Sequence, residues 1–437
     1  MMPPPQSAQP ELVRAIGRWS MVALAVNSIV GSGIFGLPAP VAGFLGRASP
    51  LAVMLAGVGM AVIIACYGEV ASQFTETGGT YLYLRRAFGR LIGIQVAWFA
   101  LLSRLTAVAA AVNLLVTYLA EFWPHAVRPA PRLAIITAFI GGLAAVNCRG
   151  VRAGTRMSNV STVAKLAALG GVCAAGLIWL TLHPALAATP TAASGDSWLR
   201  ALLLLLFAYG GYEAALNPMG EARNPRRDVA FALFLALAIV TVIYSLLQWV
   251  VVALLPDPAH SQRPLADAAR VMLGEGGAAL ISVGALISIY GYVSANMLTT
   301  PRGIFAPAQN GDFPALLAAV HPRWRTPYLS ILLFALLLWL FSQFAGFAWN
   351  VTLSAVTRIV YYAGICAAVP VLRRRQPEAP AFRVPGGYLL PAAGIAICLV
   401  LLTRVDFGQS LFLLATVAVG LINWALVRDR PARLLQA

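Results

Sequence analysis

The chain has 437 residues, of which 60% are hydrophobic and 11% are charged. Soluble domains carry about 25% charged residues, so this composition excludes a soluble globular protein and predicts a polytopic membrane protein in a lipid bilayer. The formal net charge of +16 is compatible with a nucleic-acid partner, but the arginines concentrate on alternate loops, as the positive-inside rule describes. We therefore expect no nucleic-acid partner, a bacterial inner membrane location and both termini in the cytoplasm.

The apolar residues form twelve segments, and each is near the roughly 20 residues that a helix needs to cross a bilayer. They cover residues 19–45, 50–73, 91–122, 132–148, 157–182, 197–220, 229–255, 277–305, 327–344, 347–371, 386–403 and 407–427. Short connections join them, and the polar ends at 1–18 and 428–437 are expected to be cytoplasmic tails. The sequence therefore predicts an all-α fold of about twelve transmembrane helices.

The first segment is interrupted in its middle by Gly31, Ser32 and Gly33. A glycine inside a helix costs about 1 kcal/mol relative to alanine, and in lipid the freed backbone groups need other partners. Discontinuous helices use such breaks as binding sites, with the half-helix N-terminus for anions and the unwound carbonyls for cations. The alternative is that Gly33 only allows close packing between helices.

A second interruption lies in the sixth segment, where Gly210 and Gly211 follow Phe207. It begins a second set of five segments, and an odd number of segments per half places the two halves in opposite orientations. This is the pattern of an inverted repeat, in which paired broken helices meet at the midplane. The expected boundaries are 19–182 for the first repeat, 197–371 for the second, and 386–427 for helices 11 and 12.

Several short motifs resemble those of the amino acid–polyamine–organocation (APC) transporters. The motifs are Gly31-Ser32-Gly33-Ile34-Phe35 with Pro38, the stretch from Phe207 to Glu213, Glu221-Ala222-Arg223-Asn224-Pro225-Arg226-Arg227, and the stretches 301–305, 310–314, 325–327 and 382–387. The resemblance extends over nearly the whole chain. The resemblance implies a five-plus-five inverted-repeat core with discontinuous helices 1 and 6, two peripheral helices, and secondary transport of amino acids or related amines.

The resemblance also implies which residues bind the substrate. Free N–H groups and the helix dipole at the first break can bind a carboxylate, and unpaired carbonyls near the breaks can bind an ammonium. The matching positions are Gly31, Ser32 and Gly33 for the carboxylate, and Ile29, Phe207 and Gly210 for the ammonium. The ring of Phe207 matches the family's aromatic lid, with ordinary helix packing as the alternative.

Lys165, in the fifth segment, is the single lysine of the chain. A lysine at the bilayer centre costs about 2.5–3.5 kcal/mol on insertion scales, so it normally faces the protein interior and has a role. Some members of the resembled family place a lysine here, where sodium-coupled relatives bind sodium. Burial disfavours the charged form of an amine, so we expect Lys165 to carry a coupling proton, with Glu213 as the next candidate. A permanently charged structural tether is the alternative.

Two arginines, Arg104 and Arg358, also lie at mid-depth, in the third and tenth segments. They can pair with Glu213, or face the central cavity and disfavour cationic substrates by like-charge repulsion. In the eighth segment, Tyr292 and Asn296 are four residues apart and share one polar helical face. We expect this face to line the core, and we include Arg104 and Asn296 among the substrate-binding residues.

The leading hypothesis is a sodium-independent, proton-coupled secondary transporter of amino acids, moving neutral ones by preference. An exchanger or exporter is the alternative within transport, because no residue encodes direction. A transporter-like amino acid receptor is less favoured, since no soluble output domain is visible. An enzyme is not expected, because the segments contain no His or Cys cluster and no nucleophile elbow. We expect no cofactor and no metal site, and the oligomeric state stays open.

Overall fold

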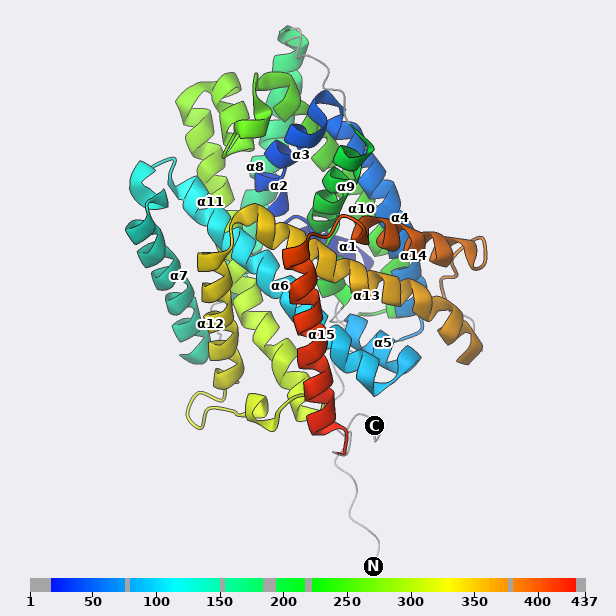
Figure 1. Cartoon of the computed structure of the whole chain (residues 1–437). Coiled ribbons are helices and arrows are strands. Elements are labelled where there is room, and N and C mark those ends of the chain that lie inside the picture. Colours follow the sequence, from blue (N-terminus) through cyan, green and yellow to red (C-terminus); the bar gives the residue numbers. More distant parts are fainter. Residues whose placement is uncertain are drawn as a thin grey trace, which may run out of the picture.

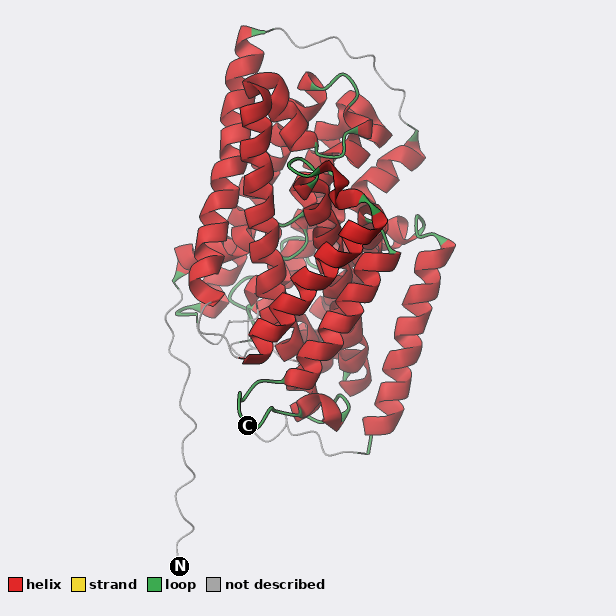
Figure 2. Ribbon diagram, turned by 90° about the vertical axis from the view of Figure 1, so that its left-hand side faces the viewer, coloured by secondary structure: helices red, strands yellow, loops and turns green. Residues whose placement is uncertain are grey.

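The computed structural model describes residues 17–74, 79–149, 154–183, 194–216, 222–375 and 380–429. Within these ranges the chain forms α-helices and short 3₁₀ helices joined by loops, with no strand (Figures 1 and 2). Ten of the described helices are long and apolar enough to cross a membrane, and two shorter apolar helices, α12 (Tyr328–Phe344) and α14 (Leu389–Leu402), accompany them. The predicted all-α polytopic fold is confirmed. The predicted tails at 1–18 and 428–437 fall largely outside the described residues.

The remaining helices have these bounds: α1 (Arg18–Ile29), α2 (Gly33–Gly36), α3 (Pro38–Leu45), η1 (Gly46–Ala48), α4 (Ser49–Ala71), α5 (Gly79–Phe88), α6 (Arg90–Leu119), η2 (Pro124–Val127), α7 (Pro129–Arg149), α8 (Gly154–Leu182), α9 (Gly195–Tyr209), η3 (Tyr212–Leu216), α10 (Pro225–Leu254), η5 (Pro258–His260), α11 (Pro264–Gln309), η6 (Ala315–Ala318), α13 (Phe347–Arg375) and α15 (Phe407–Val427). Proline in the first turn begins α10 and α11, where its missing N–H is not needed. Asp406 begins α15 through a capping box with Gln409.

Both predicted helix breaks are present. The first segment divides into α1 and α2, with the unwound residues 30–32 between them. The sixth segment divides into α9 and the 3₁₀ helix η3, with Gly210 and Gly211 between them. Gly211 has φ of 109°, a left-handed conformation that glycine adopts at little cost. Helices 1 and 6 are therefore discontinuous, as the sequence predicts.

The structure differs from the sequence prediction at the eighth and eleventh segments and at α5. The eighth segment begins at Pro264 rather than 277, because a further helix precedes a sharp bend at Gly274 (φ 72°). Its Asp267 and Arg270 reduce the hydropathy, so a search for apolar runs starts too late. The eleventh segment begins at Leu389 rather than 386, since Gly386 and Gly387 have positive φ. The helix α5 is too short and too basic to register as a span.

The helix contacts follow a paired pattern. α6 packs against α13 while α11 packs against α8, and α4 packs against α9 while α10 packs against α1. In an inverted repeat, α1, α4, α6 and α8 of the first half correspond to α9, α10, α11 and α13 of the second. Replacing each helix by its counterpart turns the α6–α13 contact into the α11–α8 contact, and the α4–α9 contact into the α10–α1 contact. This pattern supports the inverted repeat, and its boundaries at 19–182 and 197–371 stay a prediction.

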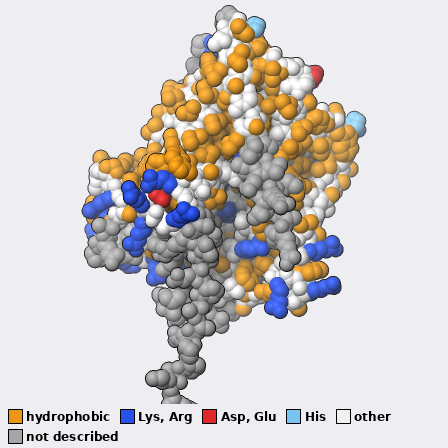
Figure 3. All heavy atoms as spheres, turned by 180° about the vertical axis from the view of Figure 1, so that it is seen from behind, with side chains coloured by type: hydrophobic (Ala, Val, Ile, Leu, Met, Phe, Trp, Pro, Cys, Tyr) orange, Lys and Arg blue, Asp and Glu red, His pale blue; other side chains and the backbone are white. Residues whose placement is uncertain are grey.

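Burial places α6 at the centre of the bundle and α15 at its edge. In the most apolar stretch of each helix, 89% of the residues are buried in α6 and 17% in α15. Figure 1 shows α6 running diagonally through the middle, with α15 in front of it. On the face in Figure 3, Lys and Arg side chains gather toward the lower end, and hydrophobic side chains cover most of the rest. The two broken helices therefore lie inside a bundle whose outer surface suits lipid.

Candidate functional site

The first break presents polar groups that lack partners. The chain unwinds after Ile29, and α2 begins at Gly33. The backbone N–H groups of Gly31, Ser32 and Gly33 have no acceptor in the described part of the chain. The buried Oγ of Ser32 likewise has no hydrogen-bond partner among the described residues. Buried polar groups are normally paired, so these donors have the arrangement that a bound carboxylate would satisfy.

Lys165 contacts the same break from α8. Its Nζ donates hydrogen bonds to the carbonyl oxygens of Asn27, at 2.8 Å, and Val30, at 2.6 Å. The side chain is 6% exposed. The carbonyls at the end of α1 lack helical partners and lie at the negative end of the dipole, which favours a cation there. Lys165 therefore stabilises the unwound end of α1, as expected for an amine in a cation position. Its role in coupling stays a prediction.

The two breaks lie directly against each other. A Cβ atom on Gly211 would lie 2.3 Å from the carbonyl oxygen of Ser28, so only glycine allows the approach. A Cβ on Gly33 would lie 3.3 Å from the nearest ring carbon of Phe207. The Phe207 side chain is itself buried. The fold therefore brings together two glycine motifs that are far apart in the sequence, and places the Phe207 ring on the first of them.

The carbonyls that we expected to bind an ammonium differ in how fully they are occupied. A carbonyl oxygen has two lone pairs. Ile29 O accepts one hydrogen bond, from Tyr244 Oη at 3.3 Å. Phe207 O accepts two, from Arg358 Nη1 at 3.3 Å and from the Gly210 N–H at 3.1 Å. Gly210 O accepts none from the described backbone. Among the described residues, the carbonyl oxygens that can still accept a hydrogen bond are therefore Ile29 O at the first break and Gly210 O at the second.

Arg358 packs onto the second break from α13. Its Nη1 is so close to the backbone that a Cβ on Gly210 would lie 1.4 Å from it. The Nε donates to Ser103 Oγ at 3.1 Å, and the guanidinium carbon lies 5.5 Å from the centre of the Phe207 ring. An arginine at this distance is attracted to the ring by a cation–π interaction. Arg358 is thus held against the second break.

Glu213 is the acidic group of the site. Its carboxylate accepts hydrogen bonds from the Gly211 N–H, at 2.7 Å, from Tyr361 Oη, at 3.2 Å, and from Tyr362 Oη. Arg358 lies near enough to interact with it electrostatically, yet the described residues contain no direct ion pair between them within 4.0 Å. Glu213 is therefore hydrogen-bonded by neutral donors in direct contact, while Arg358 stabilises its charge from a greater distance.

Arg104 faces the same cluster from α6. It interacts electrostatically with Glu213 and Tyr292, and none of the described residues forms a hydrogen bond with it. The Tyr292 ring, from α11, lies 3.6 Å from where a Cβ on Gly31 would be. Asn296 instead donates to the Tyr292 carbonyl of its own helix, at 2.9 Å. From this polar face Tyr292 therefore packs on the first break, while the Asn296 amide hydrogen-bonds to its own helix.

Sequence reasoning missed three tyrosines of the site. Tyr292 was on the polar face of the eighth segment but was not included among the binding residues. Tyr361 and Tyr362 follow Arg358 by about one helical turn. The signal available was a run of polar side chains on one face of a very apolar helix. Tyrosines are common in membrane helices, so only their contact with Glu213 distinguishes them.

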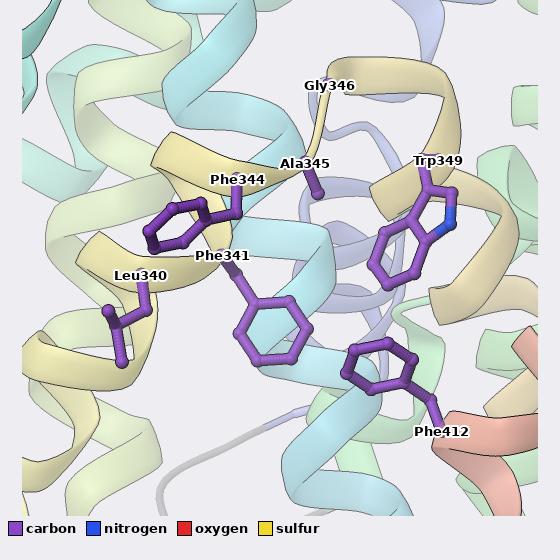
Figure 4. Close-up of a pocket in the computed structure, with 7 residues that line it drawn as sticks. All are labelled: Leu340, Phe341, Phe344, Ala345, Gly346, Trp349 and Phe412. Atoms are coloured by element: carbon purple, nitrogen blue, oxygen red, sulfur yellow. The ribbon is translucent and has the colours of Figure 1, made fainter. Parts of the chain in front are cut away.

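A separate apolar hollow lies between α12, α13 and α15 (Figure 4). It is lined by Leu340, Phe341, Phe344, Ala345, Gly346, Trp349 and Phe412. Phe344 is 84% exposed, and no lining residue is charged, so the hollow suits lipid rather than a zwitterion. Among the described residues, no group of three or more His, Cys, Asp or Glu could hold a metal ion.

Comparison with known proteins identifies the family of this chain. A family model described as amino acid permease matches residues 16–424. The chain is 27% identical to the methylthioribose transporter of Bacillus subtilis, over 96% of this chain and 95% of that protein. It is 23% identical to the branched-chain amino acid permease BcaP of the same bacterium, over 98% and 96%. It is 27% identical to that bacterium's serine/threonine exchanger SteT, over 88% and 89%. The chain therefore belongs to the amino acid permease family of the APC superfamily, and is a multi-pass membrane transporter rather than an enzyme.

Proposed function

We propose that this protein is a secondary transporter that carries amino acids without a cationic side chain, including neutral ones. The substrate carboxylate binds the free N–H groups and the Ser32 hydroxyl at the first break, and its ammonium binds near the carbonyls of Ile29 and Gly210. The observation that carries the proposal is the buried, unpaired Ser32 Oγ beside free N–H groups, directly opposite the second break. This arrangement offers donors for a carboxylate and acceptors for an ammonium in the same part of the fold.

Alternating access requires the site to open to one side at a time. Ion pairs join core helices at the end that we assign to the cytoplasm. Arg18 pairs with Asp228 at 2.8 Å and links α1 to α10, while Arg373 pairs with Glu69 at 2.6 Å and links α13 to α4. The gathering of basic side chains at one end supports the assignment, with both termini in the cytoplasm of a bacterial cell. Breaking these pairs opens the inner side.

Coupling to protons is the second part of the proposal. Lys165 places a positive charge on the carbonyls at the end of α1, so no sodium ion is needed there. Loss of a proton weakens the amine's attraction to both carbonyls, since hydrogen bonds from a charged donor are about twice as strong as neutral ones. Protonation of Lys165 therefore stabilises the conformation in which its amine binds the carbonyls of Asn27 and Val30.

Uptake of labelled amino acids into proteoliposomes tests the proposed function. We expect faster uptake when the outside is more acidic than the inside, and an unchanged rate when sodium is replaced by potassium or choline. The alternative of an exchanger is favoured by the name of one relative, the serine/threonine exchanger. An exchanger would take up label only when the vesicles already contain unlabelled amino acid. A strict requirement for sodium would contradict the proposal.

Phe207 is expected to act as a lid over the bound substrate. Its ring contacts Gly33 and lies under the Arg358 guanidinium. Phe207→Ala should therefore weaken binding or uncouple transport, while Phe207→Trp should be better tolerated because it keeps an aromatic face. Binding and uptake measured on both variants check this. If both variants match the wild type, the ring serves only for packing.

A further inference from the structure

We propose that the site prefers amino acids with a second, anionic group on the side chain, and that Arg104 and Arg358 together bind this group. The inference rests on the proposed function and specifies the substrate class within it. It follows from the unused donors, the charge balance and the position of the two guanidiniums relative to the first break.

The two guanidiniums have more donors than the protein satisfies. An arginine carries five N–H groups and accepts no hydrogen bond. Arg358 uses its Nε on Ser103 and its Nη1 on Phe207, and its Nη2 has no partner among the described residues. Arg104 has no hydrogen-bond partner in the described chain, although its electrostatic neighbour Glu213 is buried and its neighbour Tyr292 is partly buried. Oxygen atoms of a ligand would satisfy these donors.

The net charge of Arg104, Arg358 and Glu213 also favours an anionic ligand. Arg104 and Arg358 each contribute one positive charge, and Glu213 contributes the one negative charge that the described residues place against them. The tyrosines around Glu213 are neutral donors. Glu213 compensates the buried Arg358, so one positive charge is left over at the partly exposed Arg104. A zwitterion with a neutral side chain leaves this charge in place, while an additional carboxylate neutralises it.

The positions fit a short dicarboxylic amino acid. The Tyr292 ring edge lies against Gly31, at the first break, while its electrostatic neighbours are Arg104 and Arg358. A substrate whose α-carboxylate binds the first break can therefore extend its side chain along Tyr292 to the two guanidiniums. Arginine binds carboxylates with two parallel hydrogen bonds, which a side-chain amide cannot match.

The two arginines have different restraints, which assigns them different roles. Arg358 is fixed by Ser103, by the Phe207 carbonyl and by contact with Gly210. Arg104 is partly exposed and has no such restraint within the described structure. Arg104 is therefore the group that can contact the side chain of the substrate. Substituting Arg104 should change substrate specificity without changing the backbone geometry of the breaks.

Glutamate and glutamine provide the test, because they have nearly the same size and differ in charge. Their affinities are measured by calorimetry on the purified full-length protein, with lysine as a cationic competitor. We expect the wild type to bind glutamate about tenfold or more tighter than glutamine, and lysine not to compete. Arg104→Gln should lose the preference for glutamate, so that the ratio of the two affinities falls to about one. Arg104→Lys should keep part of the preference, since it retains the charge.

Arg200→Gln is the matched control, because Arg200 is exposed and pairs with Asp196 at the protein surface. It should bind both ligands as the wild type does. Equal affinity of the wild type for glutamate and glutamine would overturn the inference and leave the proposed function standing. An unchanged preference in Arg104→Gln would also overturn it. Serine is measured as a third ligand. If the wild type binds none of glutamate, glutamine and serine, the proposed function fails together with the inference.

Discussion

Lys165→Ala is expected to abolish transport while substrate binding becomes weaker but stays measurable. The substitution removes the amine that holds the carbonyls of Asn27 and Val30 at 2.8 and 2.6 Å. Hydrogen bonds from charged groups contribute about 1.5–3 kcal/mol each, so the unwound end of α1 loses much of its support. The donors at Gly31–Gly33 are on the other side of the break and remain. Uptake into proteoliposomes and equilibrium binding of a labelled substrate separate the two effects.

Lys165→Arg distinguishes a coupling residue from a tether. Guanidinium is planar, bulkier than an ammonium and permanently charged, so it should not restore transport. Rates measured across pH 5–9 should vary in the wild type and lose that variation in the variant. Arg200→Lys, at an exposed surface ion pair, is the control for a lysine–arginine exchange. Full activity of Lys165→Arg with the pH profile of the wild type would show that Lys165 is a static tether, with Glu213 the next candidate.

Gly33→Leu is expected to eliminate substrate binding in a protein that still folds. A Cβ at Gly33 already lies 3.3 Å from both Ala208 Cα and the Phe207 ring. The longer side chain would enter the space between the two breaks, where the substrate carboxylate binds. Overpacking costs about 1–3 kcal/mol, and the carboxylate would lose its N–H donors as well. Binding of labelled substrate to the purified variant, beside its melting temperature, measures both consequences.

A glycine facing open space provides the matched control for that substitution. Gly141 lies in α7, and a Cβ there meets nothing within 4 Å. Gly141→Leu should therefore bind and transport like the wild type. Gly33→Ala should have a smaller effect than Gly33→Leu, because only the Cβ must be accommodated. Normal transport by Gly33→Leu would move the substrate site away from the first break.

The spans and the breaks could be predicted from the sequence because their causes are local. A helix in lipid must be long and apolar, and a glycine pair weakens it wherever it occurs. The same local reasoning identified Lys165 and Arg358, since a charged side chain at membrane depth is costly and normally functional. It misplaced the start of α11, where a polar helix joins an apolar one at Gly274. The family resemblance assigned roles to the residues at the breaks.

The partners of each group were decided only by the tertiary structure. Hydropathy does not show that Arg358 packs on Gly210 or that Lys165 reaches Val30, because these contacts join helices far apart in the chain. The sequence left open whether the arginines pair with Glu213. The fold instead gives Glu213 the hydroxyls of two tyrosines and leaves Arg104 without a hydrogen bond among the described residues. The sequence alone determined that charged groups lie at membrane depth. Packing determined which of these groups remain available to a substrate, because a hydrogen-bond donor is satisfied only by an acceptor in direct contact with it.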